Sequence, residues 1–227
     1  MVKKYLIVSF LLILSVVLFF SFKNQKEEEL VDIIKIEKEE NKIEALKDGS
    51  YSLLTYESNF IWQASKKNIL DHKIKGSLDF LESYFIFENK NITEGVFEID
   101  ITSLEVLKMQ ELGSKNDLKD HLKSKDFFDV YNYPKARLEI IESNINDFDD
   151  AGLLYDVLAK LTIKDIEQEI SFSAMVYSLN EKAKVQANFN LDRRLWDINY
   201  GSSSFFDLLA DEIIDDYFKV SIDLLFE

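Results

Sequence analysis

The histidines are the first side chains to consider for chemistry, because imidazole can bind a metal ion or move a proton near neutral pH. His72 and His121 are the only two, and they lie far apart with no short ligand spacing between them. Zinc and iron sites use several ligands at characteristic spacings, which this pair and the scattered carboxylates do not provide. We therefore predict no metal site and no cofactor, and if the fold encloses a cavity, both histidines are candidates for the polar residues at its mouth.

The arginines are the second candidates. Arg193 and Arg194 are adjacent, and the third arginine is Arg137. A guanidinium group at a cavity mouth can bind a phosphate or carboxylate through two parallel hydrogen bonds. In a chain this acidic, a salt bridge to a neighbouring Asp or Glu is the alternative role. The sequence leaves both roles open, and on the first of them Arg193 and Arg194 are predicted head-group contacts.

Nucleophilic and acid–base catalysis find little support in the sequence. The run Ser202-Ser203-Ser204 lacks the pattern of a strained nucleophile turn and suits a helix cap instead. Carboxylate pairs such as Asp215-Asp216 are expected by chance in so acidic a chain. Because no catalytic residues converge, we predict that the protein is not an enzyme. A hydrolase or isomerase acting on a lipid-like substrate is the alternative.

Aromatic and branched apolar residues recur at every second position of several segments, which places them on one face of a strand. Side chains on the inward face of a β-domain either fill its core or, where the interior is open, line an apolar tunnel. The pattern does not separate these states, so a structural interaction module with a filled core stays an alternative. The predicted tunnel-lining residues are Phe60, Trp62, Phe97, Ile99, Phe172 and Phe189.

The elements that would position these side chains follow the same period of two. Runs with one apolar and one polar face begin near Ser58, Phe97, Tyr155, Ile170, Val185 and Phe218. Such runs are typical of antiparallel sheets, and no helices of the βαβ type intervene. Polar connections such as Asn144 to Asp150 would join the strands into an all-β sandwich or barrel.

One stretch, residues 116–134, departs from the strand pattern. Asn116 or Asp117 can cap a helix in which Leu118 and Leu122 share a face. A second short helix, from Ser204 to Ala210, follows the serine run. We expect both helices to cover the ends of the β-domain.

The end of the same stretch predicts an apolar plug. Phe127 and Phe128 follow the helix, and Pro134 prevents its continuation. After Pro134 the alternation resumes, so the chain is expected to re-enter the sheet there.

The segment HLKSKDFFDVYNYPKA, residues 121–136, resembles the signature segment of the YceI-like family. Other segments agree with the family in order: Ser58–Trp62 with His72 downstream, Gly95–Asp100, Leu161–Lys164, and Asp192-Arg193 with Tyr200–Ser202. Several motifs in one order, spread over Tyr51 to Phe226, are far more specific than any one of them. The resemblance implies a lipocalin-like antiparallel β-barrel that holds a polyisoprenoid or another long-chain amphiphile. Asp165 stands where the family usually has Gly.

The N-terminal segment predicts a membrane anchor or a signal. Tyr5 to Phe22 is an uncharged run of 18 residues, which as a helix spans roughly 27 Å, near the thickness of the hydrocarbon core. Lys3 and Lys4 precede the run and acidic residues follow Lys26, so we expect the N-terminus in the cytoplasm and the domain outside it. A cleaved signal peptide is the alternative, although the bulky residues before Lys23 suit cleavage poorly.

The chain therefore divides into an anchor or signal segment (residues 1–26), a charged linker (27–50) and one barrel domain (51–227). The expected location is periplasmic or otherwise extracytoplasmic, with residues 5–22 anchored in the inner membrane. On this reading the protein is an exported lipid-binding protein that holds or carries a long-chain isoprenoid or fatty amphiphile.

Composition excludes several partners. The formal net charge is −15, and because residues 1–26 carry four lysines and no acid, −19 falls on the rest. Such a chain repels polyanions, so nucleic acid is excluded as a partner. The absence of cysteine excludes disulfides and thiol nucleophiles. A membrane, contacted through the N-terminal helix, is an expected partner, and a homodimer is left open.

Overall fold

The computed structural model describes residues 43–44, 46–66, 73–109, 114–149, 152–202 and 213–227. In this part of the chain, one antiparallel sheet is accompanied by a single α-helix, α2 (Lys115–Lys123), and two 3-10 turns, η1 (Thr55–Glu57) and η2 (Arg193–Trp196). The strands are β1 (Ile43–Glu44), β2 (Gly49–Ser52), β3 (Asn59–Ser65), β4 (Lys73–Phe80), β5 (Tyr84–Glu88), β6 (Asn91–Lys108), β7 (Lys135–Asp149), β8 (Gly152–Ile163), β9 (Ile166–Leu179), β10 (Lys182–Asp192) and β11 (Tyr217–Phe226). The prediction of an all-β fold is confirmed for these residues.

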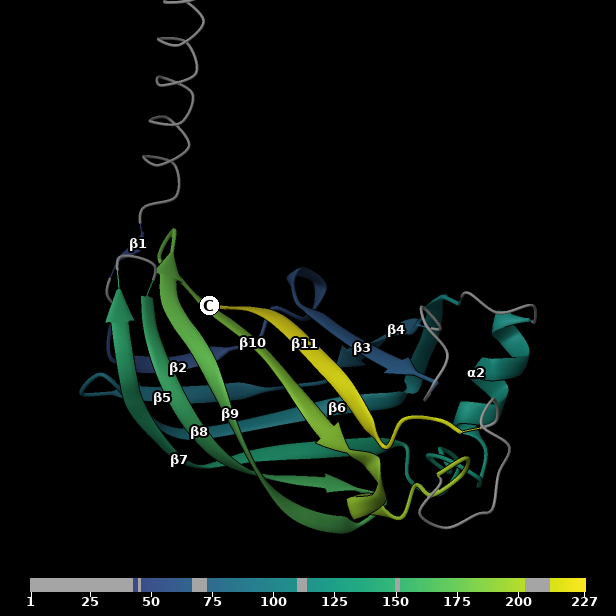
Figure 1. Cartoon of the computed structure of the whole chain (residues 1–227). Coiled ribbons are helices and arrows are strands. Elements are labelled where there is room, and N and C mark those ends of the chain that lie inside the picture. The colour runs from purple at the N-terminus through teal and green to yellow at the C-terminus, as the bar shows by residue number, and fades with distance from the viewer. Residues whose placement is uncertain (1–42, 45, 67–72, 110–113, 150–151, 203–212) are drawn as a thin grey trace, which may run out of the picture. The chain divides into compact units, whose positions relative to one another are not determined.

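The sheet closes on itself. In the series β6-β4-β3-β11-β10-β9-β8-β7 each strand pairs antiparallel with the next, and β7 pairs again with β6. Closure leaves these strands without a free edge. Figure 1 shows them wrapped around a common interior, with α2 beyond one end and β2 and β5 toward the other. A ring of about eight strands is the size at which the interior either fills with side chains or holds one small ligand.

Three tight hairpins connect neighbouring strands through pairs of residues in left-handed backbone conformation. The pairs are Asn89-Lys90, Lys164-Asp165 and Asn180-Glu181, with φ between 51° and 65°. Positive φ at both central residues is the requirement of the type I′ turn, whose twist matches that of the flanking strands. Asp165, where the resemblance led us to expect glycine, has a φ of 58°, which lies in the region that glycine adopts most freely.

The predicted alternation holds along the strands. On β8, for example, Tyr155, Val157 and Ala159 are each no more than 3% exposed, whereas the intervening Asp156 is exposed. The expected connection from Asn144 to Asp150 is wrong, because residues 144–149 continue β7 and pair with β8. Their turn-forming composition is overridden because β8 offers a continuous partner and the outer face of a strand accepts polar side chains.

The helix predicted near Leu118 is present, but its cap differs from the prediction. Ser114, not Asn116 or Asp117, precedes α2, and its Oγ accepts a hydrogen bond from the backbone N–H of Asp117 at 3.4 Å. Ser114 has the extended backbone of a capping residue, so Asn116 and Asp117 become part of the first turn. After α2 the chain turns and enters β7 at Lys135, as predicted for the segment after Pro134.

The end of the ring away from α2 is a filled core. Phe85 packs edge-to-face on Phe226 with ring centroids 4.8 Å apart, and Tyr51 stacks on Phe85 at 5.1 Å. Phe85, Phe226 and Tyr155 are at most 1% exposed. The backbones of Ser52 and Glu227 exchange hydrogen bonds of 2.7 and 3.0 Å, which join β2 to the end of β11. Tightly packed aromatic rings therefore fill the interior between Phe85 and Phe226 at this end.

Several predictions concern other parts of the chain. Residues 1–42 and the predicted helix Ser204–Ala210 lie outside the described residues, so the anchor, most of the linker and the second helix stay predictions. Pairing of described strands begins at Ile43, opposite Leu179, within the segment predicted as linker. Among the described residues, no helix has the length and apolar character needed to cross a membrane.

Candidate functional site

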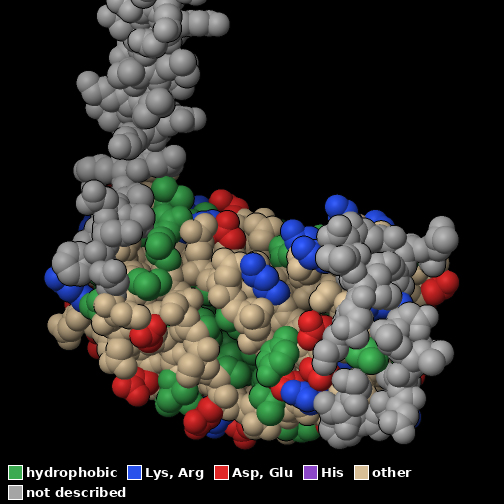
Figure 2. All heavy atoms as spheres, in the orientation of Figure 1, with side chains coloured by type: hydrophobic (Ala, Val, Ile, Leu, Met, Phe, Trp, Pro, Cys, Tyr) green, Lys and Arg blue, Asp and Glu red, His purple; other side chains and the backbone are tan. Residues whose placement is uncertain are grey.

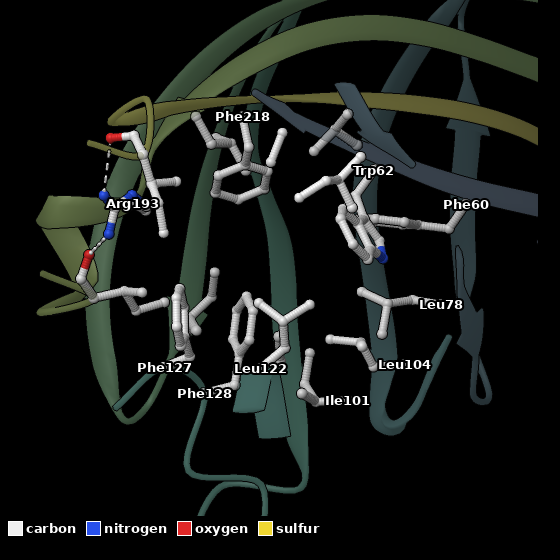
Figure 3. Close-up of a pocket in the computed structure, with 18 of the residues that line it drawn as sticks. Phe60, Trp62, Leu78, Ile101, Leu104, Leu122, Phe127, Phe128, Arg193 and Phe218 are labelled. Atoms are coloured by element: carbon white, nitrogen blue, oxygen red, sulfur yellow. Dashed lines mark hydrogen bonds between the residues drawn. The ribbon is translucent and has the colours of Figure 1, made fainter. Parts of the chain in front are cut away.

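The end of the barrel next to α2 contains a cavity of about 380 Å³, which we call the main cavity. Figure 3 shows side chains from strands on all sides, and from α2 and the segment after it, directed toward this common space. Its walls are almost entirely apolar, and they include Phe60, Trp62, Leu78, Ile101, Leu104, Leu122, Phe127, Phe128 and Phe218. Binding cavities for small ligands have this size range and this kind of lining.

The polar lining residues all lie toward one end. They are Ser65 and Lys66 at the end of β3, Ser114 and Asp117 at the start of α2, Arg193 after β10, and Asp215 before β11. Every one of these segments is at the α2 end, and the rest of the lining is apolar. The cavity can therefore hold an apolar chain inside and polar atoms at the α2 end.

A second, smaller space continues the interior away from α2. This inner pocket measures about 60 Å³, and its lining is entirely apolar. Four residues line both spaces: Phe60 on β3, Ile99 on β6, Leu138 on β7 and Phe189 on β10. The barrel thus has three levels, namely the main cavity, the inner pocket and the filled aromatic core.

The residues predicted to line a tunnel lie around these two spaces. Phe60, Ile99 and Phe189 line both, Trp62 lines the main cavity, and Phe97 and Phe172 line the inner pocket. The sequence did not indicate the lining residues that the connections between elements contribute, such as Met109, Ile198 and Ile214. These residues lie outside the long alternating runs, so no periodic signal could have identified them.

Trp62 is part of the wall and depends on Gly76 on the paired strand β4. The indole is 8% exposed, and Trp62 is the direct partner of Gly76 across the two strands. A Cβ atom at Gly76 would lie 2.1 Å from Cζ2 of Trp62 and 2.1 Å from the carbonyl oxygen of Glu105. The missing side chain lets the indole pack against the strand instead of projecting further into the cavity.

Arg193, a predicted head-group contact, lies at the α2 end of the main cavity and is only 5% exposed. Its Nη1 donates to the carbonyl oxygens of Ile198 and Tyr200, each at 2.7 Å. Its Nε donates to the carbonyl of Asp215 at 3.1 Å, and Nη2 to that of Ile214 at 3.3 Å. Figure 3 shows the guanidinium turned toward backbone carbonyls. One side chain therefore joins two segments that cover this end.

Arg194 has partners of a different kind. Its Nη2 lies 2.6 Å from Oδ2 of Asp192, and its Nη1 lies 3.3 Å from Oδ2 of Asp216. The hydrogen bond with Asp192 raises the pKa of Arg194, and the same contact lowers the pKa of Asp192. Burial lowers the pKa of Arg193, while Asp216, 3.5 Å from its Nη2, favours the charged form. Both arginines have structural partners, and their head-group role stays a prediction.

His121 lies on α2 within an aromatic cluster. Its ring meets Tyr200 edge-to-face at 4.6 Å and Phe127 at 5.1 Å, and its Nε2 is 3.3 Å from Oδ2 of Asp126. Phe127 in turn lines the main cavity, so His121 supports the cover of the cavity from outside its lining. His72, the other predicted mouth residue, lies outside the described residues.

A metal centre and a basic patch are two further kinds of site to consider, the first on the described residues and the second on the face that Figure 2 shows. The described residues contain no group of three or more side chains suited to hold a metal ion. On the face shown in Figure 2, Lys and Arg side chains are scattered among Asp and Glu and form no continuous patch. The main cavity is therefore the feature on which a function can be argued.

A closed antiparallel ring around an apolar cavity, with its polar groups at one end, is the architecture of β-barrels that enclose one small ligand. The chain belongs to the YceI-like family, because the profile of the YceI-like domain matches residues 51–226. This match confirms the resemblance found in the sequence. No curated protein matches the sequence.

Solved structures show the same fold. BcnA from Burkholderia cenocepacia superposes with a TM-score of 0.59 at 19% identity, covering 76% of this chain and 98% of that protein. A polyisoprenoid-binding domain from Saccharophagus degradans, implicated in plant cell wall breakdown, gives 0.55 at 17% identity, with coverage of 78% and 97%. A YceI protein from Campylobacter jejuni gives 0.53 at 17% identity, with coverage of 70% and 87%. At these identities the likeness establishes the fold.

Proposed function

We propose that the domain binds the hydrocarbon chain of an amphiphile in the main cavity, with the head group at the α2 end. The observation that carries this proposal is the cavity of about 380 Å³ whose polar lining residues all lie at one end. Burial of each methylene contributes about 0.8 kcal/mol, so such a cavity binds a chain without any catalytic group. The Saccharophagus degradans relative is a polyisoprenoid-binding domain, which supports an isoprenoid or a fatty-acid derivative as the ligand class.

Organic extraction of untreated, purified protein tests this proposal. Mass spectrometry of the extract should find a long-chain amphiphile near one per chain. Ala136→Trp places a large ring at a position that lines the main cavity and should reduce the recovered ligand strongly. Asn190→Trp adds the same ring on an exposed position of β10 and should leave recovery unchanged.

Two outcomes would favour the alternatives. If extraction recovers no ligand, and the delipidated protein binds no added hydrocarbon chain, the structural interaction module is favoured. Recovery of a cleaved or rearranged product of an added lipid would favour the hydrolase or isomerase. Retained melting temperature in Ala136→Trp is required in each case, so that ligand loss is not a consequence of unfolding.

We also propose that the lipocalin-like domain is exported and tethered to the inner membrane by residues 5–22. The support is the length of the uncharged run and the lysines that precede it. Cell fractionation should find the full-length protein in the membrane pellet, with the barrel accessible to protease only from outside the cytoplasm. A soluble product that starts after Phe22 would instead identify a cleaved signal.

A further inference from the structure

We propose that four side chains in the barrel interior limit the length of the chain that the domain accepts to about 15 carbons. These residues, which we call the waist, are the four that line both spaces: Phe60, Ile99, Leu138 and Phe189. The inference rests on the proposed function, and it adds a chain-length class and the residues that determine it.

The waist residues face one another from two sides of the ring. Phe60 on β3 and Phe189 on β10 belong to the strands that flank β11. Ile99 on β6 and Leu138 on β7 belong to adjacent paired strands, which lie across the ring from β11. Two aromatic rings on one wall are thus opposed by two branched aliphatic side chains on the other.

Each aromatic ring of the waist is held by a second phenylalanine. Phe189 stacks on Phe172, with centroids 4.5 Å apart and an interplanar angle of 21°. Phe60 meets Phe80 edge-to-face at 5.8 Å and 60°. Because Phe80 and Phe172 line only the inner pocket, they support the waist from the side that lies away from the main cavity. A chain entering from the α2 end therefore meets rings that are packed from behind.

The two volumes give the expected chain length. A cavity of about 150 Å³ in another protein takes one benzene, or roughly 25 Å³ per carbon. On that scale the main cavity of about 380 Å³ holds about 15 carbons. The inner pocket of about 60 Å³ holds about two more, and then only if the waist opens. Beyond it lies the filled core of Phe85 and Phe226, so the interior offers a long chain no further space.

Competition among chains of different length tests the inference. The full-length protein is delipidated and offered mixtures of linear fatty acids, and separately of prenols, and native mass spectrometry quantifies what is bound. Affinity should rise about fourfold per methylene up to about 15 carbons and then stop rising. A 40-carbon prenol that binds clearly more tightly than a 15-carbon prenol would overturn the inference.

Phe189→Ala opens the waist and should move the preferred length upward by about eight carbons, about six for the space of one ring and about two for the inner pocket that becomes accessible. Phe218→Ala is the matched control, because Phe218 lines only the main cavity. It frees the same ring volume without reaching the inner pocket. A larger increase in preferred chain length for Phe189→Ala than for Phe218→Ala would support the role of the waist. Equal increases would show that only the total cavity volume determines the preferred length.

Ala174→Val makes the complementary test by reducing the inner pocket, which Ala174 lines without lining the main cavity. The variant should leave the preferred length of the wild-type protein unchanged, because the chain ends above the waist. Combined with Phe189→Ala, it should reverse part of the increase in preferred chain length that Phe189→Ala produces. Shortening of the wild-type preference by Ala174→Val would mean that the chain already passes the waist.

The results also separate this inference from the proposed function. If no fatty acid or prenol of any length binds the protein or its variants, the proposed function fails. If chains bind but preference shows no limit near 15 carbons, only the waist inference fails. Melting temperatures of all variants confirm that binding is compared between folded proteins.

Discussion

The two ends of this barrel are built from the same alternating strands but have opposite interiors. Away from α2, Phe85 and Phe226 are no more than 1% exposed and fill the space between the walls. Next to α2, inward residues at equivalent alternating positions, such as Trp62 and Phe218, surround a cavity of about 380 Å³. An identical period-two pattern therefore specifies which residues point inward without specifying whether they meet.

The difference lies in what covers each end. At the filled end, β5 brings Phe85 into the interior, and Tyr51 of the paired strand β2 stacks on it. At the other end, the described part of the cover includes α2 and the backbone segments that Arg193 holds through four carbonyl groups. Hydrogen bonds to backbone carbonyls hold the covering segments across the ring at the α2 end, whereas at the filled end the rings gain stability by packing into the interior.

The largest expected effect comes from emptying the filled end. Phe226→Ala should lower the free energy of unfolding by about 3–5 kcal/mol, because it leaves a cavity beside Phe85 and Phe97. Phe218→Ala, at the wall of an existing cavity, should cost less than half as much. Denaturant titration of both variants measures the difference, and equal losses would contradict the contrast between the ends.

The second effect concerns the cover at the α2 end. Arg193→Met should cost about 3 kcal/mol, because it leaves buried carbonyls without a donor and Asp216 with one cation fewer. Arg194→Met removes a more exposed guanidinium, whose ion pair is screened by solvent, and should cost much less. Thermal unfolding measures both losses. A folded Arg193→Lys variant that loses only anionic ligands would support the predicted head-group contact.

The third effect compares two glycines. Gly76→Ala should destabilise by about 1–3 kcal/mol and weaken chain binding, since its Cβ would meet the Glu105 carbonyl and the Trp62 indole at 2.1 Å. Gly95→Ala should cost less, because its nearest contact is the end of the flexible Ile140 side chain, at 2.6 Å. Melting temperature and bound ligand are the measurements. Unchanged binding in a folded Gly76→Ala variant would exclude the indole as part of the wall.

The smallest effect is a dependence on alkaline pH at the filled end. Burial raises the pKa of Tyr155 to about 12, and its hydroxyl donates to the carbonyl of Lys90 at 2.7 Å. Because the folded pKa lies above the unfolded value near 10, this contribution to stability is complete below about pH 10 and is lost toward about pH 12.

Tyr155→Phe should therefore show a smaller loss of stability than the wild-type protein between about pH 10 and 12. At neutral pH the variant should lose only the hydrogen bond to Lys90, worth about 0.5–1.5 kcal/mol. Equilibrium unfolding at several pH values gives both quantities. Parallel pH profiles would show that Tyr155 ionises equally in the folded and unfolded protein.

Much of the fold could be predicted because alternation is a local property. The runs through Phe60, Phe97 and Phe189 needed only the period of two to identify one inward face. Local composition misled where tertiary pairing was stronger, as in residues 144–149, where β8 extends a strand through residues typical of turns. The cap of α2 was misplaced for a related reason, since Asn116 and Asp117 are good capping residues that Ser114 precedes.

The residues of the site likewise fall into those that the sequence could predict and those that it could not. The sequence predicted the six aromatic and aliphatic lining residues, because each lies on an alternating run whose inward face is decided locally. It could not assign Arg193, because the choice between a head group and four backbone carbonyls depends on segments that meet only in the folded chain. Nor could it predict the waist, because Phe60 and Leu138 are distant in sequence and come together only when the ring closes.

By itself, then, the sequence determined the class of fold, the inward faces and the family, since these follow from periodicity and from ordered motifs. Only the tertiary structure decided that one end is hollow and the other filled. Strand periodicity fixes the direction of a side chain, whereas a cavity depends on the distance between opposite walls and on what covers them. Those two quantities are set by ring closure, by the packing of β2 and β5, and by the carbonyls that Arg193 holds in place.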